Sequence, residues 1–329
     1  MPTRRRALLI LAALAGLALA SIALALMAGS IRIPINVAIA TLFGTPDGVA
    51  ADVVRSLRLP RALAAFACGG LLALAGALLQ VLLRNPLADP YVLGISGGAG
   101  VGALLAILFG FGVGGINGSA FVGALAAMLV VFSLAHGDGS WTQTRLLLTG
   151  VIVASGCGAA VALMLSIAPD DRLRGMLFWL MGDLSQANDP QFVLAVLAAA
   201  LLVCLPFARE LNLLARGADT AQALGVSVVP LRRGVYIVAS LATAAAVTQA
   251  GAIGFVGLIV PHLIRLAVGN DQRLLLAASA LAGGSLLVVA DTLARTMIAP
   301  QQLPVGVLTA LIGVPVFLFL LSRDRQTRR

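Results

Sequence analysis

Residues 84–103 read RNPLADPYVLGISGGAGVGA, a polar turn followed at once by a glycine-rich segment. The two prolines of the turn prevent a continuous helix through it, because proline lacks a backbone N–H and restricts the residue before it. Gly94, Gly98 and Gly102 then recur at every fourth position, which leaves one face of a helix almost bare. Such a face predicts that a neighbouring helix packs closely, or that a transport path runs along it, and the two interpretations are compatible.

The chain around this stretch is strongly apolar. Hydrophobic residues make up 60% of the 329 residues, charged residues make up 11%, and the mean hydropathy is +1.04. A soluble globular chain needs more polar surface than this. The apolar runs are continuous and lack the alternation of an outer-membrane barrel. The composition therefore predicts an all-α, polytopic membrane protein.

Ten apolar runs are bounded by charges, prolines or glycine clusters, and they predict ten transmembrane helices. The eighth is short and is interrupted by Pro261, and the first is too long for a cleaved signal peptide. All 22 basic residues are arginine, and most fall on one side of the predicted membrane if the N-terminus lies inside. Both termini are therefore predicted to be cytoplasmic. The predicted spans are roughly residues 7–28, 62–83, 92–109, 119–135, 146–168, 192–207, 234–250, 253–268, 274–297 and 305–321.

The chain lacks the residues that several kinds of chemistry require. Without lysine the chain cannot form a P-loop, so ATP hydrolysis is expected on another chain. His136 and His262 have no partners at metal-ligand spacing, so no metal site and no cofactor are expected. Ion-coupled carriers usually keep a carboxylate near the bilayer middle. The nearest candidate here, Asp291, falls in the outer third of its span, so a partner is expected to supply the driving energy.

The longest polar stretch on the predicted cytoplasmic side is residues 209–233, RELNLLARGADTAQALGVSVVPLRR. Asp219 and Gln222 match a capping box, Gly225 is a natural helix stop, and Pro230 is expected to bar further helix. The local prediction is a helix of about two turns.

That helix is expected to run from about Ala218 to Leu224, with Ala221 and Leu224 on one side. A helix this short is not stable alone in water. It must therefore pack against the chain's own spans or against another protein, and an ordinary connecting loop is the alternative interpretation.

The sequence resembles the FecCD family, the permease subunits of type II ABC importers for iron–siderophore, haem and cobalamin. The resemblance runs in order from about residue 55 to 321 and departs at Gln143, where a small hydroxyl residue is expected. It is carried by the opening stretch and by SLRLPRALAAF, FWLMGDLS, LNLLARGADTAQALGV, GAIGFVGLIVPHLIRLAVGNDQR, and ADTLART followed by LPVGVLTALIGVPVFLFLL.

The resemblance implies a single ten-helix permease domain over residues 1–329 in a bacterial inner membrane. It also implies a second copy of the chain, two cytoplasmic ATPase subunits and a periplasmic substrate-binding protein as partners. The family's functional positions fall on three sets of residues here. These are an ATPase-coupling helix (Gly217, Ala218, Asp219, Thr220, Ala221, Leu224 and Gly225), an inner gate (Asn85, Leu87, Gln143 and Thr144) and two arginines that dock the binding protein (Arg58 and Arg295).

Two other functions compete with an importer permease. An ion-coupled carrier or channel would work without an ATPase, and a membrane-embedded enzyme would need a nucleophile, an acid–base pair or a metal constellation that the sequence does not present. Nucleic acid is not needed to explain the positive charge. The cargo stays open among the three chelates, with an iron chelate expected first and cobalamin next.

Overall fold

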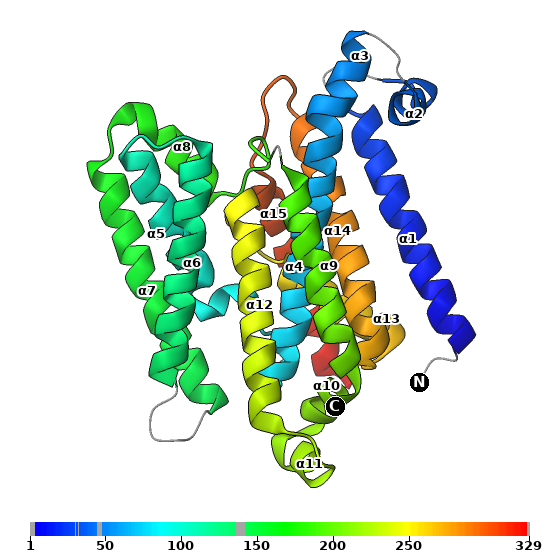
Figure 1. Cartoon of the computed structure of the whole chain (residues 1–329), viewed down its shortest axis with the longest axis vertical. Helices are drawn as coiled ribbons and strands as arrows, with labels where there is room; N and C mark the ends of the chain where they lie inside the picture. The colour runs from blue at the N-terminus through cyan, green and yellow to red at the C-terminus, as the bar shows by residue number, and fades with distance from the viewer. Residues whose placement is uncertain are drawn as a thin grey trace.

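The computed structural model describes residues 4–29, 31, 33–44, 48–135, 142–187 and 189–327, and the regular elements within these ranges are all helical (Figure 1). In chain order they are α1 (Arg4–Met27), α2 (Ile35–Phe43), α3 (Val49–Asp52), the π-helix η1 (Val53–Arg58), α4 (Leu59–Leu82), η2 (Pro90–Leu93), α5 (Ile95–Leu108), α6 (Val113–Ala135), α7 (Gln143–Ile167), α8 (Asp170–Leu180), α9 (Pro190–Cys204), η4 (Leu205–Phe207), α10 (Ala208–Arg216), α11 (Ala218–Ala223), α12 (Val228–Ala250), α13 (Val256–Val268), α14 (Gln272–Thr296) and α15 (Val305–Thr327).

Each of the ten predicted spans coincides with one of these helices, namely α1, α4, α5, α6, α7, α9, α12, α13, α14 and α15. Among the described residues, seven helical stretches are long and apolar enough to cross a membrane. The other three, in α5, α13 and α15, are shorter apolar helices. The 14 residues of α5 rise about 21 Å, less than the ~30 Å of a bilayer core. The all-helical membrane class is confirmed, and the crossing count of ten stays a prediction.

The helix α4 forms the centre of the molecule and is buried along most of its length. It packs against α9, α12, α13 and α14 (Figure 1). Glycines permit this crowding, because a Cβ atom at Gly76 would lie 1.8 Å from the carbonyl oxygen of Gly257, and one at Gly69 would lie 2.3 Å from that of Gly283. Close backbone approach of this kind is how membrane helices gain packing energy.

The bare face predicted for α5 packs against α6. A Cβ atom at Gly98 would lie 2.3 Å from the carbonyl oxygen of Gly123, and one at Gly102 would lie 2.0 Å from that of Ser119. Gly94 has a different function, since its φ of 74° forms the turn that starts α5. The glycine spacing therefore serves helix packing, which confirms the first of the two interpretations.

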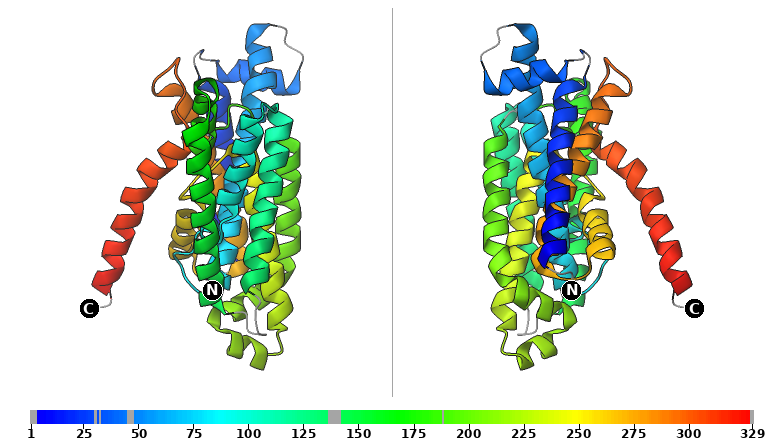
Figure 2. Two further views of the ribbon diagram at one scale, coloured as in Figure 1. Left: turned by 90° about the vertical axis from the view of Figure 1, so that its left-hand side faces the viewer. Right: turned by 90° about the vertical axis from the view of Figure 1, so that its right-hand side faces the viewer.

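Several helices leave most of their apolar surface outside the bundle, among them α1, α7 and α15. Of the 25 residues in α7, only Leu146, Gly150 and Met164 are buried. The helix α15 leans away from the other helices along its length, as both views in Figure 2 show. Apolar surfaces of this kind suit contact with lipid or with another protein.

The two ends of the bundle carry different short elements. The helix α11 lies at one end, while α2 and α3 lie at the other (Figure 1). The start of α1 and the end of α15 point toward the α11 end (Figures 1 and 2). That both termini share the cytoplasmic side with residues 209–233 stays a prediction. The sequence did not predict α2, α3, η1 and α8, which cover the opposite end.

Candidate coupling surface and associated sites

The polar stretch 209–233 folds as two short helices and the start of a long one. The helix α10 extends α9, so that Pro190–Arg216 forms one helical stretch. The α10 part of this stretch is amphipathic. Its buried residues are Ala208, Leu211 and Leu214, which fix it against the bundle. Gly217 then breaks the helix with a φ of 134°, a conformation that favours glycine.

The predicted short helix is present as α11, but its cap differs from the prediction. Gly217 occupies the N-cap position and no side chain caps the helix, so the capping box of Asp219 and Gln222 does not form. Asp219 lies instead in the first turn, where a carboxylate is favoured by the helix dipole.

The end of α11 forms a Schellman motif. The N–H of Gly225 donates to the carbonyl of Gln222, and the N–H of Val226 donates to that of Ala221, both at 3.0 Å. Gly225 has the positive φ, 84°, that this motif requires. The predicted helix stop is therefore confirmed.

Ala221 and Leu224 do not share a face, contrary to the sequence interpretation. Ala221 is 0% exposed and anchors α11 to the chain's own core, whereas Leu224 is 61% exposed at the C-cap. Asp219 and Thr220 are exposed as well. The chain thus presents a firmly anchored knob, α11 with its C-cap, whose outer surface is open to a partner.

Pro230 does not end helical structure. It is the third residue of α12, in the first turn, where a backbone N–H has no partner within the helix. An apolar cavity of about 610 Å³ lies between α10 and the start of α12, and Leu224 and Pro230 line it together with Phe207 and Leu213. The knob is therefore bordered by an apolar hollow.

The two turns predicted to form the inner gate are joined by a hydrogen bond. The Nε2 group of Gln143, at the start of α7, donates to the carbonyl of Leu82, at the end of α4, over 3.1 Å. Asn85 organises its own turn, because its Oδ1 atom accepts the N–H of Leu87 at 2.9 Å. Thr144 and Leu87 are exposed. The structure thus brings Gln143 to the first turn, and a gating role for these residues stays a prediction.

A second link from this turn was not visible in the sequence. The side chain of Asp89 accepts the N–H of Tyr91 at 2.7 Å, and burial raises the pKa of Asp89 while this bond partly offsets the shift. The hydroxyl oxygen of Tyr91 accepts the N–H of Ile253 at 2.8 Å. The turn is therefore tied to the non-helical segment that precedes α13. The sequence gives no sign of this link, because Tyr91 and Ile253 are 162 positions apart and meet only in the folded chain.

Arg58, one of the two predicted docking arginines, is buried in this structure. It is 4% exposed, and its guanidinium group donates to the carbonyls of Leu26, Met27 and Ile31 at 2.5–3.1 Å. These carbonyls belong to the end of α1 and the segment after it. The exposed docking position expected for Arg58 is therefore not observed, because the side chain satisfies the end of a neighbouring helix instead.

Arg295, the second predicted docking residue, is also largely buried. Its side chain is 10% exposed, lies 3.3 Å from the carboxylate of Asp291, and donates to the carbonyl of Ala25. Arg61 on α4 binds the same carboxylate. The sequence missed this cluster because Arg61 lies 230 positions from Asp291, although Asp291 and Arg295 are only one helical turn apart.

Within the described part of the chain, no group of three or more His, Cys, Asp or Glu residues is arranged to hold a metal ion. His136 lies outside the described residues.

The whole chain is similar to known transport proteins. Residues 11–323 match the FecCD transport family. The chain is 43% identical over 289 residues to the cobalamin import system permease protein BtuC of Halobacterium salinarum, a match covering 87% of this chain and 77% of that protein. It is 41% identical over 284 residues to the hemin transport system permease protein HmuU of Yersinia pestis, covering 83% and 84%. A solved metal-chelate type ABC transporter in an inward-facing conformation superposes with a TM-score of 0.86 at 32% identity, covering 95% and 99%.

Proposed function

The chain belongs to the FecCD transport family, and from that premise we propose that it is the permease subunit of an importer that moves a metal chelate from periplasm to cytoplasm. Its relatives are permease subunits of ABC transporters, in which a separate subunit hydrolyses ATP. The observation that carries the proposal is the knob formed by α11 and Leu224, anchored by Ala221 and exposed at the end toward which the start of α1 and the end of α15 point. We place this end in the cytoplasm of a bacterial inner membrane.

The knob is built to transmit movement. A partner that grips Leu224 pulls on Ala221, which is fully buried, and on α10, which is continuous with α9. A displacement of α11 is therefore passed on as a rigid-body motion of α9 and α12 rather than absorbed by a flexible loop. The apolar hollow beside Leu224 adds surface on which an ATPase subunit packs.

The inner gate in this proposal comprises Asn85, Leu87, Gln143 and Thr144. The hydrogen bond from Gln143 to the carbonyl of Leu82 supports this proposal, because it holds the start of α7 against the end of α4, beside the first turn. Opening requires that bond to break. Glutamine, rather than the small hydroxyl residue expected there, supplies the reach to α4.

A second copy of the chain is proposed to pack on α7 and to complete the transport path. The support is the large unburied surface of α7, on which a Cβ atom added at Gly156 or Gly158 would meet no neighbouring atom within 4 Å. Small residues on an open helix face suit close packing with another helix.

The cargo is proposed to be a large metal chelate. The named functions of two relatives, cobalamin import and hemin transport, favour a metal macrocycle more directly than the iron–siderophore expected from the sequence. A binding protein is proposed to deliver it at the α3 end. Direct docking through Arg58 and Arg295 stays a prediction, since both side chains would have to leave their present bonds.

The alternative, an ion-coupled carrier, has little support in the structure. The carboxylate of Asp291 lies within a candidate span but is bound by Arg61 and Arg295, so it is not available to a coupling ion.

Reconstitution tests the proposal. Proteoliposomes containing the chain, its ATPase subunit and its binding protein should take up cobalamin, haemin or a ferric siderophore only when ATP is supplied on the α11 side. An ionophore should leave the uptake unchanged. Uptake by the chain alone, driven by an ion gradient and abolished by the ionophore, would overturn the proposal in favour of the carrier.

A further inference from the structure

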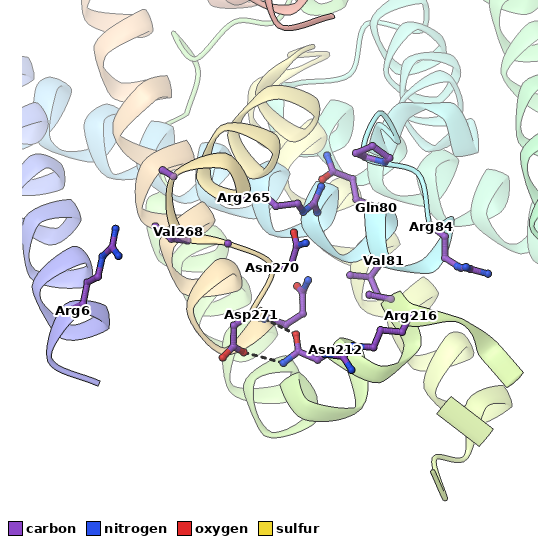
Figure 3. Close-up of a pocket in the computed structure, with 15 residues that line it drawn as sticks. Arg6, Gln80, Val81, Arg84, Asn212, Arg216, Arg265, Val268, Asn270 and Asp271 are labelled. Atoms are coloured by element: carbon purple, nitrogen blue, oxygen red, sulfur yellow. Dashed lines mark hydrogen bonds between the residues drawn. The ribbon is translucent and has the colours of Figure 1, made fainter. Parts of the chain in front are cut away.

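A cavity of about 770 Å³ opens at the α11 end of the bundle, separate from the knob (Figure 3). Its lining comes from the start of α1, the end of α4 and the turn after it, α10, the end of α13, and the turn between α13 and α14. Figure 3 shows Arg265 and Gln80 at one end of the cavity and Asn212 and Asp271 at the other. The proposed coupling and gating residues do not line this space, although Arg84 and Pro86 of its lining belong to the turn that holds Asn85 and Leu87.

The cavity lining is strongly positive. Four arginines line it: Arg6, Arg84, Arg216 and Arg265. The single carboxylate in the lining, that of Asp271, is already engaged, since it accepts hydrogen bonds from Asn212 Nδ2 at 2.9 Å and from the N–H of Arg273 at 3.1 Å. An anion is therefore the ligand that this space favours, and guanidinium groups suit phosphate oxygens in particular.

Two buried amide side chains in the lining have unused acceptors. Gln80 is 4% exposed and Gln272 is 2% exposed, and neither Oε1 atom has a hydrogen-bond partner. The Nε2 group of Gln80 is used, because it donates to the carbonyl of Leu258 at 3.2 Å. Buried acceptors are rarely left without donors. A ligand that carries hydroxyl or amine donors beside its phosphate would satisfy them.

Exposed apolar side chains lie beside the cavity. Leu9, in the same turn of α1 as the lining residue Arg6, is 63% exposed, and Leu266, between the lining residues Arg265 and Ala267 of α13, is 65% exposed. Both α1 and α13 pack against α14. This places an apolar surface next to a basic pocket near the predicted membrane boundary, which is the arrangement that a phospholipid requires.

We propose that this cavity binds the headgroup of an anionic phospholipid that bears hydroxyl groups, with phosphatidylglycerol as the reference ligand. Arg6 and Arg265 contact the phosphate, the hydroxyls donate to Gln80 and Gln272, and the acyl chains lie along α1 and α13. Because Asn212 and Arg216 belong to α10, the bound lipid also braces the helix that leads into α11. The proposal does not depend on which cargo is carried.

Native mass spectrometry of the full chain in a non-ionic detergent tests the site. Phosphatidylglycerol should bind about tenfold more tightly than zwitterionic phosphatidylcholine, an energy that one or two charge-assisted bonds supply. Arg6→Gln with Arg265→Gln should remove that preference. The matched pair Arg5→Gln with Arg273→Gln removes the same charge from neighbouring positions outside the cavity and should keep it.

Phosphatidylmethanol separates the role of the amides from that of the charge, since it has the same charge as phosphatidylglycerol but no hydroxyl group. The wild-type chain should prefer phosphatidylglycerol by about threefold, in line with a neutral hydrogen bond. Gln80→Met with Gln272→Met should abolish this preference. If that variant fails to fold, the comparison of the two lipids on the wild-type chain still shows whether the hydroxyl groups contribute to binding.

Three results would overturn the proposal. An equal loss of binding in the Arg5/Arg273 pair would show a diffuse charge effect rather than a site. Displacement of the lipid by millimolar inorganic phosphate or glycerol phosphate, as effectively as by phosphatidylglycerol itself, would assign the cavity to a free phosphate compound. Equal binding of phosphatidylglycerol and phosphatidylmethanol to the wild-type chain would show that the site does not recognise the hydroxyl groups of the headgroup.

Discussion

The carboxylate of Asp291 on α14 accepts three hydrogen bonds from the guanidinium group of Arg61 on α4, at 2.8–3.1 Å. Arg61 also donates to Gln302 at 2.8 Å, and Arg295 approaches the same carboxylate from the next turn of α14. This cluster joins the two most central helices at the end opposite α11. Asp291 is 2% exposed, so these bonds replace the water that its carboxylate loses on burial.

Asp291→Asn should therefore destabilise the chain. It leaves Arg61 and Arg295 partly buried without a counter-charge, and the expected fall in the free energy of unfolding is about 3 kcal/mol. Denaturant-induced unfolding in mixed micelles measures it. The control is Asp171→Asn, because Asp171 is exposed and lies 4.0 Å from Arg172; it should change stability by less than about 1 kcal/mol. Equal stability of Asp291→Asn and wild type would show that the cluster is not structural.

Leu224→Asp should separate coupling from folding. The residue is 61% exposed, so the chain should fold normally, but a charge in the docking surface should prevent co-purification of the ATPase subunit and ATP-driven uptake. Ala221→Asp is the contrasting variant, because it buries a charge at a position with 0% exposure and should abolish the fold itself. Normal co-purification and transport by Leu224→Asp would refute the coupling role of the knob.

Gly102→Ala tests the contact between α5 and α6. The added methyl group would meet the carbonyl oxygen of Ser119, and the overpacking should cost about 1–3 kcal/mol. Gly118→Ala, on the facing helix, meets no atom within 4 Å and should be neutral or stabilising by up to about 1 kcal/mol. The unfolding midpoints of the two variants, measured side by side, check this. A similar gain in stability in both variants would mean that helix propensity, rather than the contact with Ser119, decides.

Arg58→Gln distinguishes a structural from a docking arginine. Loss of three bonds to the carbonyls at the end of α1 should lower stability by about 1–3 kcal/mol, while Arg174→Gln, which alters an exposed arginine on α8, should not. The assay combines thermal unfolding with binding-protein titrations at low and high salt. Unchanged stability with a salt-dependent loss of binding would instead support direct docking by Arg58.

Local sequence signals were sufficient for the helices and insufficient for the polar contacts. The ten apolar runs became helices, because length and hydropathy are properties of one segment, and the spacing of Gly98 and Gly102 predicted a close contact for the same reason. The placement of Arg58 depends on where α1 ends, 31 positions earlier in the chain. An arginine at a membrane boundary can reach lipid headgroups, a partner or its own chain, and the sequence does not distinguish them.

The candidate coupling surface shows the same division. The short helix and its stop at Gly225 follow from the residues themselves. The cap and the start of the next helix did not, since Gly217 has no side chain to signal an N-cap, and Pro230 is compatible with both a loop and a first turn. The bonds of Gln143 and Tyr91 join distant segments, so only the folded chain shows them.

The phenol of Tyr91 has a further consequence for how the molecule rearranges. It fastens the turn after α4 to the extended backbone before α13, and the amide of Ile253 has this oxygen as its acceptor. If one segment moves by more than the length of a hydrogen bond, either the other segment moves with it or the bond between Tyr91 and Ile253 breaks. The turn after α4 and the start of α13 are thereby coupled, so a change of shape that begins at either one is passed directly to the other.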